Sequence, residues 1–138
     1  MEGLERRELL QEELALVVPI AHPLAGRAEV ALADLASEDF IWVPEGATSS
    51  HPLYAACLAA GFAPRIACIS GSAQGMQELV AAGLGIALLP RLAIHPPPGA
   101  TVIELTPPRP TRTLAAVWRP DRLSHAATVF LHQLTDGP

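Results

Sequence analysis

The chain has 138 residues, half of them apolar, and a formal net charge of −5 at pH 7. A chain of this length buries roughly two-thirds of its extended surface as one domain, or part of one, so a core needs no disulfides. The modest negative charge without a basic stripe excludes an electrostatic footprint for nucleic acid in this segment.

Apolar runs in the first third of the chain predict two strands and a short helical turn. Residues 14–18 are continuously apolar and Pro19 closes the run, which is typical of a buried strand. A helical turn is expected at residues 32–36. The second strand is predicted at residues 40–43, where Pro44 ends it.

A helix is expected after a loop at residues 45–48. Ser49 or Ser50 can cap this helix, and Pro52 falls in its first turn, where a missing N–H costs nothing. The helix is predicted to run to about residue 60, and Gly61 closes it.

The most informative stretch follows the third predicted strand, residues 65–70. Ser72 can cap the next helix, whose apolar positions at i, i+3, i+4 and i+7 share one face: Met76, Leu79, Val80 and Gly83. Gly83 supplies the left-handed residue that ends a helix, and Gly85 allows a close turn. Residues 86–89 are expected to form a strand buried on both faces.

The last third is rich in proline and carries two further predicted strands. The proline-rich bridge at residues 95–99 is too stiff for a helix. Strands are expected at residues 101–105 and 113–118, and a final helix begins at Ser124. Strands alternating with helices predict an α/β fold, a mostly parallel sheet covered on both faces in three layers.

No motif for catalysis, cofactor or metal is found. Gly83 and Gly85 follow a helix rather than a strand and lack a third glycine, which disfavours a dinucleotide site. Ser72 stands in the wrong place for a nucleophile elbow. None of the five histidines has a metal-ligand spacing. We therefore expect no enzyme activity, no cofactor and no metal.

Two predicted helices begin directly after strands, at Ser49-Ser50 and at Ser70-Gly71-Ser72. Ligands of open α/β sheets settle at the carboxyl ends of strands, and a helix N-terminus suits a carboxylate or phosphate. The alternative, that these serines only cap their helices, stays open at this point.

Cys57 and Cys68 have no CxxC spacing, which favours reduced thiols in a cytoplasmic protein. The longest apolar run, residues 79–89, is too short to span a bilayer. The charged segment at residues 1–13 lacks a signal core. No membrane contact is expected.

Three ordered segments resemble the effector-binding domain of LysR-type transcriptional regulators. The first is residues 12–18 followed by His22-Pro23-Leu24-Ala25. The second is residues 30–35, then Phe40-Ile41, Pro44 and Gly46, with Ala60-Gly61-Phe62-Ala63-Pro64 after the helix. The third is residues 79–90. The resemblance implies a fold like type 2 periplasmic solute-binding proteins, in which two subdomains close on a small molecule. Family effectors are often small carboxylates or aromatic acids.

The resemblance also implies a domain organisation. Residues 1–21 would be a lead-in and hinge strand, residues 22–112 the second subdomain, and residues 113–138 the return hinge strand and a C-terminal helix. The helix-turn-helix domain that binds DNA in this family, and the first half of the first subdomain, are absent from this sequence. DNA binding is therefore expected only through such an absent N-terminal domain.

The family positions imply the site residues. The effector would contact Ala21, His22, Pro44, Glu45, Gly46, Thr48, Ser70, Gly71 and Ser72. The hinges would include Val17, Val18, Val117 and Trp118. A dimer interface would include Leu53, Cys57, Ile66 and Cys68, with an exposed apolar patch around the first two that favours self-association.

The expected function is thus a small-molecule effector-binding regulatory domain of a bacterial LysR-type regulator. The alternative is a solute-binding module without a transcriptional role, which a secretion signal or lipid-anchor cysteine would favour. A hydrolase or oxidoreductase would need a nucleophile–base pair or a cofactor loop.

Overall fold

The computed structural model describes residues 4–44 and 51–119, and its contacts divide the chain into two compact units. The second unit comprises residues 13–112, and the first comprises residues 1–12 and 113–138. The expected second subdomain, residues 22–112, falls within the second unit. The expected helix from Ser124 and the loop at residues 45–48 lie outside the described residues.

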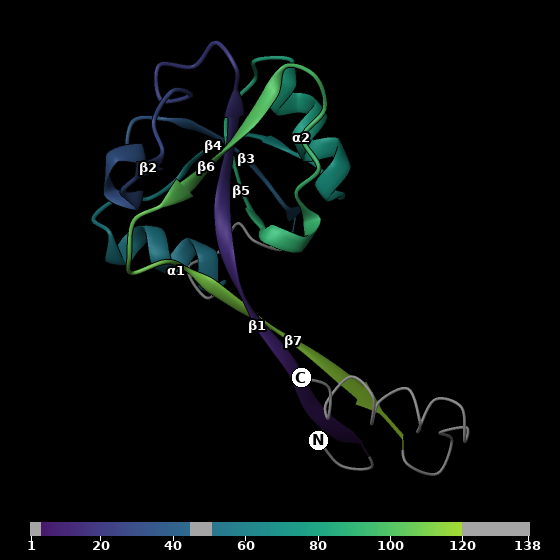
Figure 1. Ribbon diagram of the computed structural model, residues 1–138. Helices are drawn as coiled ribbons and strands as arrows, with labels where there is room; N and C mark the ends of the chain where they lie inside the picture. Colours follow the sequence, from purple (N-terminus) through teal and green to yellow (C-terminus); the bar gives the residue numbers. More distant parts are fainter. Residues whose placement is uncertain (1–3, 45–50, 120–138) are drawn as a thin grey trace. The chain divides into compact units, whose positions relative to one another are not determined.

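A mixed sheet forms around β1 (Glu5–Pro19), whose residues from Glu13 onward belong to the second unit (Figure 1). β1 is antiparallel to both neighbours, β5 (Ala87–Pro90) and β6 (Ala100–Leu105). The short strand β2 (Glu29–Val30) adds to β6 in parallel. β7 (Thr111–Trp118) also pairs with β1.

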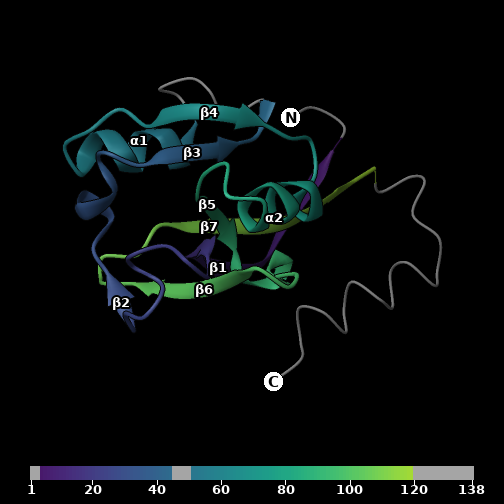
Figure 2. The same cartoon turned by 90° about the horizontal axis from the view of Figure 1, so that it is seen from above.

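A second pair of strands continues this sheet. β3 (Asp39–Trp42) and β4 (Arg65–Ile69) run side by side in parallel (Figure 2). Ile86 joins them to β5, since its carbonyl accepts from Ile41 N at 2.8 Å and its amide donates to Asp39 O at 2.9 Å. The α/β class is therefore confirmed, but the sheet is mixed, because β1 runs against its neighbours.

Two apolar clusters occupy the two faces of the sheet, because side chains alternate along each strand. Phe40 and Trp42 of β3 belong to one cluster and Ile41 to the other. The helix α1 (Pro52–Ala59) and the 3-10 turn η1 (Leu32–Leu35) contribute to the first cluster. The helix α2 (Ala73–Ala81) contributes to the second, so each helix covers its own face.

Both helices end as their glycines predict. Gly61 has a φ of 102° and Gly83 a φ of 87°, the left-handed region that favours glycine. Beyond Gly83, Leu84 N closes the end of α2 by donating to Leu79 O at 3.1 Å. A 3-10 turn, η3 (Arg91–Ala93), follows β5.

Within the described ranges, no helix is long and apolar enough to cross a membrane.

Candidate functional site

The carboxyl ends of β3 and β4 meet at one edge of the sheet. Trp42 pairs with Ile69 in register, and the amide of Ser70 donates to the carbonyl of Trp42 at 2.9 Å. β3 leads towards α1, and β4 leads through Ser70-Gly71-Ser72 into α2. This edge is where an open α/β sheet binds ligands.

Two hydroxyls lie over the first turn of α2. Ser72 caps the helix as predicted, because its Oγ accepts from Gly75 N at 3.0 Å. A Cβ added to Gly75 would lie 2.5 Å from Ser70 Oγ and 2.9 Å from Ser72 Oγ. Glycine at this position therefore gives both serines room beside free helical N–H groups. Gly71 and Ser72 are exposed, and the positive end of the helix dipole faces this edge.

The cap of α1 differs from the prediction. His51, not Ser49 or Ser50, is the N-cap residue, and its Nδ1 accepts from Leu53 N at 3.2 Å. The imidazole nitrogen replaces the hydroxyl or carboxyl oxygen that usually fills this position. Of the other predicted effector contacts, Pro44 is exposed beside β3, whereas Glu45, Gly46 and Thr48 lie outside the described residues.

His22 is not brought together with the serines. Its Nδ1 accepts from Leu24 N at 3.0 Å, so Nε2 carries the proton and donates to Glu38 Oε1 at 2.6 Å. Glu38 directly precedes β3, so this contact lies at the opposite end of the strand from Ser70. Both ring nitrogens hold the turn after β1. Ala21, next to it, is exposed.

The predicted hinge residues fall in two places. Val17 and Val18 are fully buried in the middle of the sheet, opposite Val102 and Thr101 of β6. The unit boundary lies between residues 12 and 13, so the expected first hinge does not coincide with it. Val117 and Trp118 end β7 in the first unit.

The prediction of an exposed apolar patch on α1 around Leu53 and Cys57 is wrong for Cys57. Cys57 is fully buried in the first cluster, and burial raises the pKa of its thiol to about 11. Leu53 and Ile66 pack partly buried against the same cluster, and Cys68 packs against the second. The exposed apolar side chains of these elements are instead Leu58 and Ile69, at 44% and 54%.

One polar side chain of α2, Gln77, is fully buried, which the sequence did not predict. Gln77 Nε2 donates to the carbonyls of Ala73 and Ala93 at 3.0 Å each, and its Oε1 accepts from His95 N at 2.8 Å. This amide fastens the helix to the segment after η3.

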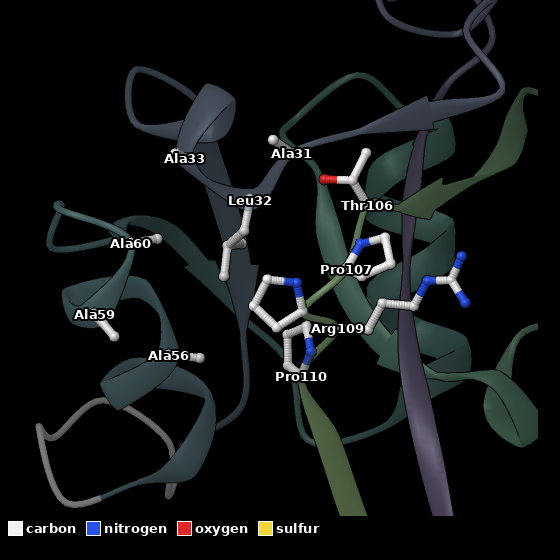
Figure 3. Close-up of a pocket in the computed structure, with 11 residues that line it drawn as sticks. Ala31, Leu32, Ala33, Ala56, Ala59, Ala60, Thr106, Pro107, Arg109 and Pro110 are labelled. Atoms are coloured by element: carbon white, nitrogen blue, oxygen red, sulfur yellow. The ribbon is translucent and has the colours of Figure 1, made fainter.

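An open-sided pocket of about 450 Å³ lies beside α1 (Figure 3). Its walls are two alanines of α1 and the C-cap Ala60, the segment around η1 and the linker between β6 and β7. The lining residues are Ala31, Leu32, Ala33, Ala56, Ala59, Ala60, Thr106, Pro107, Pro108, Arg109 and Pro110. Sequence reasoning gave no signal for this pocket, because its walls come from three separate segments.

In the part of the chain that the structure covers, no group of three His, Cys, Asp or Glu side chains is placed to hold a metal ion.

The family model of the LysR substrate binding domain matches residues 1–137, so the chain belongs to this family. It is 36% identical over 126 residues to the HTH-type transcriptional regulator YwbI of Bacillus subtilis, covering 89% of this chain and 42% of YwbI. It is 33% identical over 115 residues to the DNA-binding transcriptional dual regulator OxyR of Escherichia coli, covering 81% of this chain and 38% of OxyR.

Solved structures show the same fold. The reduced OxyR regulatory domain of Pseudomonas aeruginosa matches with a TM-score of 0.73 and 26% identity, over 99% of this chain and 65% of that one. The effector binding domain of QuiR in complex with shikimate matches with a TM-score of 0.80 and 22% identity, over 97% of this chain and 65% of that one. The chain spans about two-fifths of the length of the curated relatives YwbI and OxyR.

Proposed function

We propose that this chain supplies one side of the effector cleft of a LysR-type transcriptional regulator, as its second subdomain. The ligand is a small anionic or aromatic acid, held at the edge where β3 and β4 end. The chain acts by binding and not by catalysis. The curated relatives named above are transcriptional regulators, which favours this role over a solute-binding module without one.

The observation that carries the proposal is the bond from Ser70 N to Trp42 O at 2.9 Å. It aligns the ends of two parallel strands, each of which leads to a helix. Free N–H groups and the Ser72 hydroxyl then offer neutral donors to a carboxylate, while the Ser70 hydroxyl donates to Ser72 O at 3.4 Å. QuiR is described in complex with shikimate, which is itself a small carboxylate.

Self-association belongs to the same proposal. Leu58 on α1 and Ile69 on β4 are the exposed apolar side chains that a second copy would cover. They take the place of the buried Cys57 in the expected interface.

The test is an NMR titration of the chain with benzoate as probe, up to millimolar concentration. We expect saturable shifts at the amides of residues 70–73. Ser72→Asp keeps a good N-cap but adds a negative charge, so it should weaken benzoate binding at least about tenfold with an unchanged melting temperature. Ser72→Thr, which keeps both cap and hydroxyl, is the matched control.

Two results would overturn the proposal. The first is the absence of chemical-shift changes at residues 70–73 at millimolar benzoate. The second is a Ser72→Asp variant that binds benzoate as well as Ser72→Thr, because the serine would then be a cap only.

A further inference from the structure

We propose that the pocket beside α1 is a second small-molecule site, for an uncharged aromatic molecule of one or two rings that carries one hydrogen-bonding group. This inference rests on the second unit alone and does not depend on the proposed effector cleft. The volume of about 450 Å³ falls within the range of roughly 300–1,000 Å³ that is usual for ligand pockets.

The walls are apolar and leave room because the side chains of α1 that face the pocket are small. Ala56, Ala59 and Ala60 present only methyl groups, while Leu32 faces them from η1 (Figure 3). Proline rings from the linker complete the lining. Apolar walls on facing segments suit an aromatic ring, which buries apolar area on both of its faces.

The charge of the lining selects against an anion. Arg109 is the charged residue of the pocket, and its three guanidinium nitrogens already donate: Nε to Leu105 O at 2.6 Å, Nη1 to Glu13 at 3.1 Å and Nη2 to Glu29 at 3.5 Å. Figure 3 shows its nitrogens directed away from the alanines of α1. Two of its five N–H groups remain, but two glutamates already balance its charge, so a carboxylate in the pocket would lose its water without gaining an unpaired cation.

One polar group remains for the ligand. The backbone amide of Thr106 donates to Val30 O at 3.0 Å, whereas its hydroxyl makes no hydrogen bond to any residue that the structure describes. Figure 3 shows this oxygen directed towards Leu32, across the pocket. A hydroxyl both donates and accepts, so it can accept from an N–H such as that of indole.

The experiment is an NMR titration of the intact chain with indole. We expect saturable shifts at Ala56, Ala59 and Thr106. 1-Methylindole lacks the donor and should bind about fivefold more weakly, the usual effect of one neutral hydrogen bond. Thr106→Val should weaken indole by about the same factor while leaving 1-methylindole unchanged.

Ala59→Phe should fill the pocket and weaken both ring probes at least about tenfold. Its matched control is Ala55→Phe, at an exposed alanine of the same helix that does not line the pocket. If Ala59→Phe does not fold, as judged by its thermal transition, the Thr106→Val comparison decides the proposal alone.

Three results would overturn the proposal. One is the absence of saturable indole shifts at the lining residues. Another is an equal loss of binding in Ala59→Phe and Ala55→Phe. The third is competition of benzoate with indole for these residues. Benzoate shifts at residues 70–73 report only on the effector cleft, so the two proposals fail independently.

Discussion

Nη1 of Arg109 donates a hydrogen bond to Oε2 of Glu13 at 3.1 Å, although 96 positions separate the two residues in the sequence. Glu13 is the first residue of the second unit, and Arg109 lies close to its last, Arg112. The same guanidinium donates to the carbonyl of Leu105. One side chain thus fixes the linker between β6 and β7 against the point where β1 enters the unit.

Arg109→Gln should loosen this linker. Leu14 N donates to Pro110 O at 2.9 Å, and the linker that carries Pro110 would lose its contacts to Glu13 and Glu29. We expect faster hydrogen exchange at the Leu14 amide, measured by NMR. Arg91→Gln is the control. It breaks a bidentate ion pair with Glu104 and should leave the exchange rate of the Leu14 amide unchanged. Equally faster hydrogen exchange in both variants would contradict the role of Arg109 in holding the linker.

Gly85→Ala should destabilise the sheet where β5 meets β3. An added Cβ would lie 2.7 Å from the carbonyl oxygen of Asp39, which is backbone and cannot rotate away. We expect a loss of about 1–3 kcal/mol in the free energy of unfolding, measured by urea titration. Gly26→Ala is the control, since an added Cβ there meets nothing within 4 Å. A Gly85→Ala variant as stable as Gly26→Ala would contradict this prediction, because the Asp39 carbonyl would then move aside without a cost in stability.

Gln77→Leu should lower the free energy of unfolding, although glutamine and leucine side chains are similar in size. The substitution leaves Ala93 O and His95 N without the amide that satisfies them. An unsatisfied buried group costs about 1–3 kcal/mol, so we expect a total loss of about 2–4 kcal/mol in the same measurement. Gln74→Leu, on the exposed side of α2, should change stability by less than about 0.5 kcal/mol. If leucine at position 77 were neutral, the amide would not fasten α2 to the segment after η3.

Cys57 should resist alkylation in the native chain. Burial raises its pKa from 9.0 to about 11, so the thiolate fraction at pH 8 falls from about one in ten to about one in a thousand. We expect iodoacetamide at pH 8 to label Cys68 first and Cys57 only in denaturant, as read by peptide mass spectrometry. Rapid native labelling of Cys57 would contradict its burial.

The same thiol should make stability depend on alkaline pH. Between about pH 9 and 11 the unfolded chain releases the Cys57 proton while the folded chain retains it, so the free energy of unfolding falls as pH rises. Cys57→Ala should flatten that part of the pH profile, measured by urea titration, even though it lowers stability overall. An unchanged slope in the variant would assign the alkaline loss to other groups.

Local signals predicted most of the second unit. The strand at β3, the cap at Ser72 and the left-handed Gly83 were all read from short stretches, because each depends on neighbours in the sequence. The direction of β1 could not be read in this way. An apolar run such as residues 14–18 looks the same in a parallel or an antiparallel pair, and its partners lie more than 60 residues away.

Other features were hidden for different physical reasons. The segment of α1 is apolar on every side, so no polar face marked Cys57 as the buried position. The first half of β1 is rich in charged residues, which are not typical of a strand. It forms a strand by pairing with β7, which is distant in the sequence, so no local pattern could predict it. The contacts of Gln77 and the walls of the pocket depend on segments that meet only in the folded chain.

The central place of β1 has a practical consequence for anyone who expresses this region separately. A clone that starts at residue 22, where the sequence seems to open a new module, would omit the strand that both β5 and β6 need as a partner. The two orphaned edges would then be available to other chains, and insoluble product would be the natural outcome. A separately expressed region therefore has to include β1 from Leu14 onward, the first residue that pairs with β5.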